Sequence, residues 1–153
     1  MQVADVMTSA SVTESPHDSL RSAAETMWKQ QTGSLLVMDG DRLIGIITER
    51  DVMKAVARGR DVDATPVSEI MTRDVLTVSP QASLHEAARQ MAARWIRHLP
   101  VVDGGAVTGV VSQRDLVGIF AALVQDETGG TALASDELVR SQRLARIEHG
   151  DLD

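Results

Sequence analysis

Two seven-residue stretches share one order of residue types: GIITERD, which ends at Asp51, and GVVSQRD, which ends at Asp115. In both, a hydroxyl residue stands three positions before the aspartate, as Thr48 in the first stretch and Ser112 in the second. An aspartate at the start of a helix is able to accept two hydrogen bonds from a ribose diol. The free N–H groups of such a helix start attract phosphate. The spacing therefore fits ribose and phosphate chemistry.

The same spacing has a second interpretation that needs no ligand. Ser/Thr-x-x-Asp at a strand-to-helix junction is a relative of the capping box, in which the two side chains satisfy backbone N–H groups. Arg50 and Arg114 lie inside the stretches and either reach a phosphate or point into solvent. Gly45 and Gly109, which begin the stretches, either admit a ligand or mark a bulge. Both interpretations remain open from these residues alone.

Both stretches belong to an internal duplication. An offset of 64 residues, which separates Asp51 from Asp115, also aligns VADVMT with VSEIMT, AAETM with AARQM, and LLVMDG with LPVVDG. Between residues 3–52 and 67–116, about 18 of 50 positions are identical without a gap. The identical positions include proline, glycine and aspartate, which an alanine- and valine-rich composition does not by itself produce.

Each repeat has the pattern β-α-β-β-α. Ser19 and Ser83 stand at N-cap positions before apolar residues at helical spacing, and an Asp-Gly pair separates two strand-like runs in each repeat. The predicted elements are a helix at 19–30, strands at 34–38 and 42–48, a helix at 49–57, a helix after Ser83, strands at 99–102 and 106–112, and a helix at 113–124.

These elements predict an α/β fold of the α+β type with repeats at 1–60 and 61–124, joined by a linker at 58–66. Neither repeat is long enough to bury its own core well, so we expect the two to pack about a pseudo-two-fold axis. The remaining segment, 125–153, is predicted to be a loop at 125–134 followed by a helix. That helix begins at Ser135 or Asp136 and runs to about Glu148. Its arginine stripe is either a solvated face or a docking surface.

Composition excludes several classes of function. The formal net charge of −7 and the pI near 5.0 argue against a general nucleic-acid-binding protein. Cysteine is absent, which excludes disulfides and thiol catalysis. No apolar run approaches the ~20 residues of a membrane helix, and the N-terminus lacks a secretory layout, so we expect a cytoplasmic protein without a membrane partner. The four histidines show no metal-ligand spacing, and no catalytic set is apparent, so we expect no enzymatic activity.

The two stretches, the opening VADVMT and the HLPVVDG segment resemble a pair of CBS domains, known as a Bateman module, of the stand-alone type. The resemblance covers residues 3 to about 124. It implies a non-enzymatic module that requires no cofactor. Such a module binds adenosyl ligands, such as AMP, ADP, ATP or S-adenosylmethionine, in clefts between the repeats. It also implies a homodimer, often disc-shaped.

The resemblance implies two clefts with different residues. The first would be formed by Thr48, Asp51, Val75, Leu76, Arg97, His98 and Pro100. The second would be formed by Ser112, Asp115, Ser11, Val12, Gly33, Ser34 and Leu36. Because Gly33 and Ser34 replace the cationic pair Arg97 and His98, we expect weaker binding in the second cleft. Trp95, beside the first cleft, either stacks on a base or covers the edge of the core, and we expect the second.

Two functions follow from these observations. The first is a regulatory ligand sensor that transmits its bound state through its own dimer or to an unidentified protein partner. The alternative is a ligand-independent dimeric scaffold whose stretches only cap helices and whose C-terminal helix docks a partner.

Overall fold

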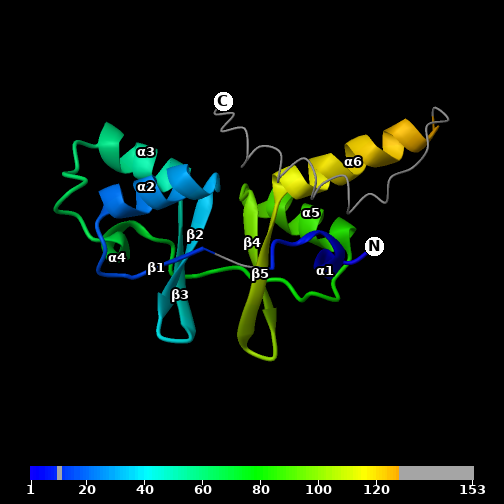
Figure 1. Ribbon diagram of the computed structural model, residues 1–153, viewed down its shortest axis with the longest axis horizontal. Helices are drawn as coiled ribbons and strands as arrows, with labels where there is room; N and C mark the ends of the chain where they lie inside the picture. The colour runs from blue at the N-terminus through cyan, green and yellow to red at the C-terminus, as the bar shows by residue number, and fades with distance from the viewer. Residues whose placement is uncertain (10–11, 128–153) are drawn as a thin grey trace. The chain divides into compact units, whose positions relative to one another are not determined.

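The computed structural model describes residues 1–9 and 12–127 as a mixed α/β structure, which confirms the predicted fold class (Figure 1). The chain divides into two compact units. Unit 1 comprises Met1–Ser9 and the chain from Thr77 onward, and unit 2 comprises Ala10–Leu76. The expected C-terminal helix, from Ser135 or Asp136 to about Glu148, and Ser11 lie outside the described residues.

Unit 2 contains a three-stranded sheet of order β1-β2-β3, in which β1 is parallel and β3 antiparallel to β2. Its elements are β1 (Thr13–Glu14), α2 (Leu20–Gln30), β2 (Ser34–Asp39), β3 (Arg42–Thr48), α3 (Glu49–Ala57) and the short α4 (Val67–Ile70). The strands and helices predicted for this repeat are confirmed, with β2 one residue longer than expected. Helix α4 was not predicted.

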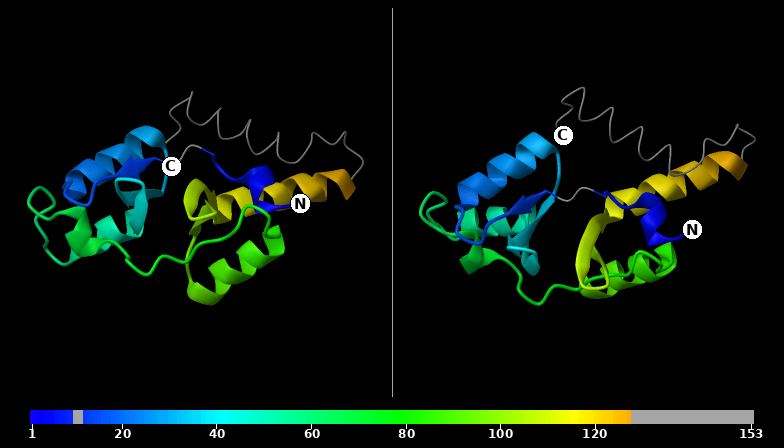
Figure 2. Two further views of the ribbon diagram at one scale, coloured as in Figure 1. Left: turned by 90° about the horizontal axis from the view of Figure 1, so that it is seen from below. Right: turned by 60° about the horizontal axis from the view of Figure 1, so that its bottom comes forward.

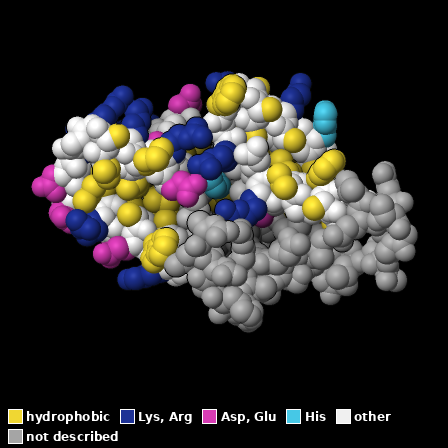
Figure 3. All heavy atoms as spheres, turned by 90° about the horizontal axis from the view of Figure 1, so that it is seen from above, with side chains coloured by type: hydrophobic (Ala, Val, Ile, Leu, Met, Phe, Trp, Pro, Cys, Tyr) yellow, Lys and Arg dark blue, Asp and Glu magenta, His cyan; other side chains and the backbone are white. Residues whose placement is uncertain are grey.

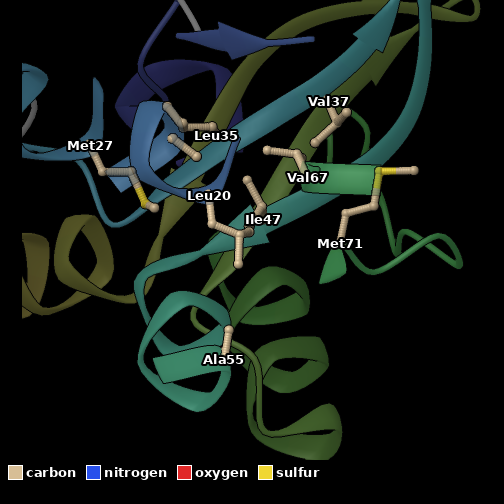
Figure 4. Packing of buried hydrophobic residues seen from close by; sticks show 9 residues of the cluster. Leu20, Met27, Leu35, Val37, Ile47, Ala55, Val67 and Met71 are labelled. Carbon is tan, nitrogen blue, oxygen red and sulfur yellow. The ribbon is translucent and has the colours of Figure 1, made fainter. Parts of the chain in front are cut away.

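The core of unit 2 lies between its helices and its sheet. Leu20 of α2, Leu35 of β2 and Ile47 of β3 are fully buried and lie close together, and Val67 of α4 reaches the same cluster (Figure 4). Helix α2 begins where sequence predicts, because the Ser19 hydroxyl accepts a hydrogen bond from the backbone N–H three residues later. The Ser19 cap thus fixes where α2 begins, and the apolar face of α2 packs this helix against the sheet of unit 2.

Unit 1 contains the antiparallel hairpin β4-β5 and its helices. Its elements are α1 (Val3–Val6), α5 (Leu84–Arg94), β4 (His98–Asp103), β5 (Ala106–Ser112) and α6 (Gln113–Glu127). The prediction that the last helix ends at residue 124 was wrong, because residues 125–127 are helical. No glycine or proline lies between Val124 and Gly129, so no helix-breaking residue ends the helix at the predicted position. In Figure 2, α5 and α6 are neighbours in unit 1, as α2 and α3 are in unit 2.

The first segment of each sequence repeat pairs with the hairpin that follows the other repeat's first helix. The N–H and C=O of Thr8 bond with Val110 of β5, at N···O distances of 2.9 and 3.1 Å. The N–H of Thr72 donates to the carbonyl of Ile46 in β3 at 2.9 Å, and the N–H of Ile46 donates to the carbonyl of Thr72 at 3.0 Å. The predicted boundaries at 1–60 and 61–124 describe the sequence repeats, whereas each compact unit combines parts of both repeats.

Gly45 and Gly109 permit this pairing. A Cβ atom on Gly109 would lie 2.4 Å from the carbonyl oxygen of Thr8. A Cβ on Gly45 would lie 2.5 Å from the sulfur of Met71 and 3.0 Å from the carbonyl oxygen of Thr72. Within each unit, these glycines therefore admit a neighbouring backbone segment of the same chain.

The prediction that Trp95 covers the core edge was wrong. Its side chain is 86% exposed, and its backbone has a left-handed φ of 55° at the end of α5. Gln31 adopts the same conformation at the end of α2, with a φ of 52°. The backbone of Trp95 therefore forms the C-cap of α5, while its side chain is exposed and does not cover the core.

Among the described residues, no helix has the length and apolar character needed to span a membrane.

Candidate functional site

The two duplicated stretches fold into the same kind of hydrogen-bonded junction, and the first contains Thr48 and Asp51. Strand β3 ends at Thr48, and α3 begins at the next residue. The Thr48 N–H donates to Asp51 Oδ2 at 2.8 Å, and the Thr48 hydroxyl donates to the same oxygen at 3.0 Å. The Asp51 N–H donates to Thr48 Oγ1 at 3.3 Å. The capping-box geometry expected for this stretch is therefore present.

The second stretch repeats this geometry in unit 1. The N–H and hydroxyl groups of Ser112 donate to Asp115 Oδ2 at 2.7 and 2.8 Å, and the Asp115 N–H donates to Ser112 Oγ at 3.3 Å. The duplicated sequence thus produces a duplicated set of contacts. In each set the hydroxyl residue and the aspartate bond to one another in both directions, which helps to hold the aspartate in one orientation.

The two junctions differ in accessibility. Asp115 is 4% exposed and Ser112 is 8% exposed, whereas Thr48 and Asp51 are only half-buried. A ligand therefore has more direct access to Asp51 than to Asp115. Weaker binding in the second cleft stays a prediction.

The contacts at Asp51 define what the side chain is able to bind. Within the described part of the chain, the hydrogen bonds found at this carboxylate fall on Oδ2, so Oδ1 remains an acceptor for a ligand hydroxyl. The helix start offers less to a phosphate than its sequence suggests. Two of the first three N–H groups of α3 are engaged, since Glu49 N donates to the Gly33 carbonyl at 3.1 Å and Asp51 N donates to Thr48. A phosphate at this junction would need side-chain cations.

Several residues assigned to the second cleft lie beside Thr48 within unit 2. Ser34 is the β2 partner of Thr48, and Leu36 is the partner of Ile46. Leu36 N also donates to the carbonyl of Val12 at 3.3 Å. The residues Val75 and Leu76, assigned to the first cleft, form the half-buried end of this unit.

Arg97, His98 and Pro100 belong to unit 1. The Arg97 carbonyl accepts a hydrogen bond from the first N–H of α6 at 2.8 Å, and His98 is the β4 partner of Ser112. Pro100 accepts a hydrogen bond from Val78 N at 3.0 Å. Both predicted clefts combine residues from two units, so their assembly stays a prediction. Ser11, assigned to the second cleft, lies outside the described residues.

A buried acidic residue was missed by sequence reasoning. Glu14 of β1 is 8% exposed, and its Oε1 accepts a hydrogen bond from the Ser22 hydroxyl at 3.2 Å. Burial raises the pKa of Glu14, and a hydrogen bond and charge repulsion from Asp18 raise it further. Comparison of the two repeats could have indicated this burial, because the residue that corresponds to Glu14 in the second repeat is the apolar Val78, which is buried.

In the described ranges, no group of three or more metal-ligating side chains is arranged to hold an ion.

The fold and the two matched junctions define a tandem-repeat α/β protein in which each repeat ends in a hairpin and a capped helix. The family profile described as CBS domain matches residues 3–58 and 67–122. The chain therefore belongs to the CBS-domain family, as the sequence resemblance predicted.

Relatives of known sequence and structure agree with this assignment. The CBS domain-containing protein YhcV of Bacillus subtilis (strain 168) is 35% identical over 134 residues, covering 87% of this chain and 93% of that protein. A putative signal-transduction protein with CBS domains from Burkholderia ambifaria MC40-6 is 36% identical, with a TM-score of 0.77 and coverage of 86% and 99%. The CBS domain pair of protein MJ0100 is 30% identical, with a TM-score of 0.73 and coverage of 79% and 96%. Its structure was solved in complex with 5′-methylthioadenosine and S-adenosyl-L-methionine.

Proposed function

We propose that this chain is a cytoplasmic, non-enzymatic regulatory module that binds an adenosyl ligand. The candidates are AMP, ADP, ATP and S-adenosylmethionine. The bound state acts on a partner protein or through the module's own dimer. Because a ligand shifts a conformational equilibrium only by its differential affinity for the two states, its contacts must differ between them.

The observation that carries this proposal is the oriented carboxylate at the start of α3. Asp51 is held by both hydrogen bonds on Oδ2, is half-buried, and keeps Oδ1 available to a ribose hydroxyl. A carboxylate already fixed in place loses little conformational entropy on binding. The MJ0100 pair, crystallised with two adenosyl compounds, supports this ligand class for a relative that the chain covers almost completely.

Side chains of unit 1 are proposed to distinguish among adenosyl ligands. A guanidinium at Arg97 and an imidazole at His98 suit a phosphate, which AMP carries and S-adenosylmethionine lacks. We assign the adenine to Val75 and Leu76, with Pro100 nearby. The second site, at Ser112 and Asp115, is proposed to bind more weakly or a less charged ligand.

A ligand-independent scaffold is the second candidate, and one observation favours it. Both junctions satisfy their own helix caps, so neither requires a ligand to hold its shape. This candidate predicts that no adenosyl compound binds. It also predicts that residues beyond 127 are needed for contact with a partner.

Calorimetric titration with AMP, ADP, ATP, S-adenosylmethionine and 5′-methylthioadenosine separates the two candidates. The sharpest variant is Asp51→Asn, because an asparagine oxygen still accepts from Thr48 N while its amide no longer accepts a ribose hydroxyl. A hydrogen bond to a charged group contributes about 1.5–3 kcal/mol, so we expect Asp51→Asn to weaken binding roughly 10- to 100-fold.

The matched control is Asp115→Asn, which changes the equivalent but buried carboxylate. We expect it to leave the main binding event intact. Thermal unfolding of both variants verifies that each is folded. If folded wild-type protein gives no heat with any of the five compounds, the scaffold candidate replaces the proposed function.

A further inference from the structure

The middle of helix α6 is apolar on every side. Its sequence at 116–124, LVGIFAALV, contains no charged residue, whereas the equivalent stretch of the first repeat, VMKAVARGR, contains a lysine and two arginines. A helix that is apolar all round is normally covered on all sides. Ile119 meets this expectation, since it is buried, but Val117, Phe120 and Leu123 are 59%, 68% and 52% exposed. In the described part of the chain, one side of α6 therefore lacks cover.

The exposed apolar residues of α6 form a stripe with a cation at its start. Val117, Phe120 and Leu123 follow one another at intervals of three, which places them on one side of the helix. Arg114, also exposed, precedes Val117 by the same interval, and these four residues are called the α6 stripe below. Hydrophobic side chains are visible on the surface over unit 1 at the right of Figure 3. A segment that covers the stripe must therefore be apolar along its length and acidic at one end.

The chain that directly follows α6 has this pattern. Its sequence predicts a helix at about 135–148. Positions at intervals of three along that helix carry, in order, Leu138, Ser141, Leu144 and Ile147. They lie on one side of a helix for the same reason as the α6 stripe. Glu148 follows them at the far end, with Asp151 beyond it. The segment thus offers a mostly apolar side of the same spacing, with its acidic end farthest from the end of α6.

The chain lengths fit an antiparallel return along α6. At a rise of about 1.5 Å per residue, α6 spans about 20 Å from Arg114 to Glu127, and a helix at 135–148 has about the same length. The connection at 128–134, TGGTALA, contains a pair of glycines and is within the roughly two to eight residues usual between packed helices. A chain that reverses there brings Glu148 opposite Arg114.

We propose that residues 135–148 fold back along α6 as an antiparallel helix, cover the α6 stripe, and place Glu148 beside Arg114. Attachment to the end of α6 favours this segment over any other occupant, because a short linker gives it a local concentration in the millimolar range. The partner of this surface is therefore part of the same chain. Another protein reaches the stripe only when the segment leaves it. The proposal depends neither on the ligand that the module binds nor on the arrangement of the two units.

Cross-linking within the cysteine-free chain tests the contact. Ala121, which is exposed on α6, lies opposite Ser141 in the antiparallel arrangement, so Ala121→Cys and Ser141→Cys are combined in one full-length chain. We expect a short bifunctional maleimide to join the two cysteines within one monomer, as measured by mass spectrometry. The control combines Ser141→Cys with Asp103→Cys, at the exposed end of β4 that lies away from α6 in Figure 1, and should not form the link. A product found only as a covalent dimer would assign the stripe to a second copy and overturn the proposal.

Hydrogen exchange in the full chain measures the packing independently. A helix of this length is marginal alone in water, so slow exchange at 138–147 reports cover by α6. We expect Phe120→Glu, a change at an exposed residue, to raise exchange there about tenfold or more, because it removes a large apolar contact. Val56→Glu changes the corresponding exposed residue of α3 and should leave exchange at 138–147 unchanged. Rapid exchange at 138–147 in the wild type, or equal protection in Phe120→Glu, would overturn the proposal.

Charge exchange tests the direction of the returning helix. Arg114→Glu and Glu148→Arg, each alone, should raise exchange at 138–147 about two- to fivefold, as expected for an exposed ion pair, and the double exchange should restore protection. Arg50→Glu, at the corresponding exposed position of α3, is the control and should have no effect there. Failure of the double exchange to restore protection would contradict the antiparallel arrangement and overturn the proposal.

Discussion

Glu14 is a buried carboxylic acid at the position where the other half of the duplication has Val78. Its neighbours include Asp18, which accepts a hydrogen bond from Ser15 N at 3.2 Å, and the Ser22 hydroxyl. Burial, followed by the interaction with Asp18, raises the pKa of Glu14 above its ordinary value of 4.5. The folded chain therefore binds a proton at this site more tightly than the unfolded chain does.

This raised pKa makes stability depend on pH. The stabilising contribution of protonated Glu14 is fully present below pH 4.5 and is lost as the pH rises through the folded pKa. We expect Glu14→Gln, which keeps an acceptor for Ser22 and adds a donor for Asp18, to be more stable than wild type near pH 7. The difference should shrink toward pH 4.5.

Urea unfolding across that pH range measures the effect. The control Asp41→Asn, at an exposed turn residue of the same unit, should follow the wild-type curve. A Glu14→Gln variant whose advantage is constant, or largest in acid, would show that the carboxylate at this position is not destabilised by burial.

At the scale of elements, the first segment of each sequence repeat completes the unit built around the other repeat's hairpin. Thr8 pairs with Val110 in unit 1, and Thr72 pairs with Ile46 in unit 2. Because a glycine on the adjacent strand permits each approach, a single methyl group should displace the segment selectively.

We therefore expect Gly109→Ala to lower the free energy of local opening in unit 1 by about 1–3 kcal/mol, a typical cost of overpacking. Hydrogen exchange should rise at residues 3–9 and in β5, while β3 keeps its protection. Gly45→Ala is the matched variant and should raise exchange around Thr72 and in β3. An increase in β3 for Gly109→Ala would contradict the observed pairing.

The helices and strands that the sequence predicts correctly are marked by residues only a few positions apart in the chain. Ser19 caps α2 through a bond to a residue three positions away, and the Thr48–Asp51 junction spans the same short distance. The pairing of Thr8 with Val110 has no such signal, because it is made by backbone groups far apart in sequence. Gly109 indicates that a backbone approaches closely, and it does not identify the segment. The two clefts, which would combine residues of different units, have no local signal either, and their assembly stays a prediction.

At the scale of the whole molecule, the two sequence repeats share one pattern but differ in the chemistry of corresponding residues. Asp51 is half-buried while Asp115 is almost fully buried, and Arg97 and His98 stand where the other repeat has Gly33 and Ser34. The proposed regulation requires that the ligand bind one conformation of the chain more tightly than another, since only differential affinity shifts an equilibrium.

The central claim is that Asp51 binds the ribose of an adenosyl ligand, and the ribose itself provides the most direct test. Wild-type protein is titrated by calorimetry with AMP and with its 2′,3′-dideoxy analogue, which lacks both hydroxyl groups. We predict that AMP binds and that removal of the diol weakens binding roughly tenfold or more, because Asp51 Oδ1 loses its donor. Equal affinity for the two compounds, or no binding of AMP or any other adenosyl compound, would contradict the claim.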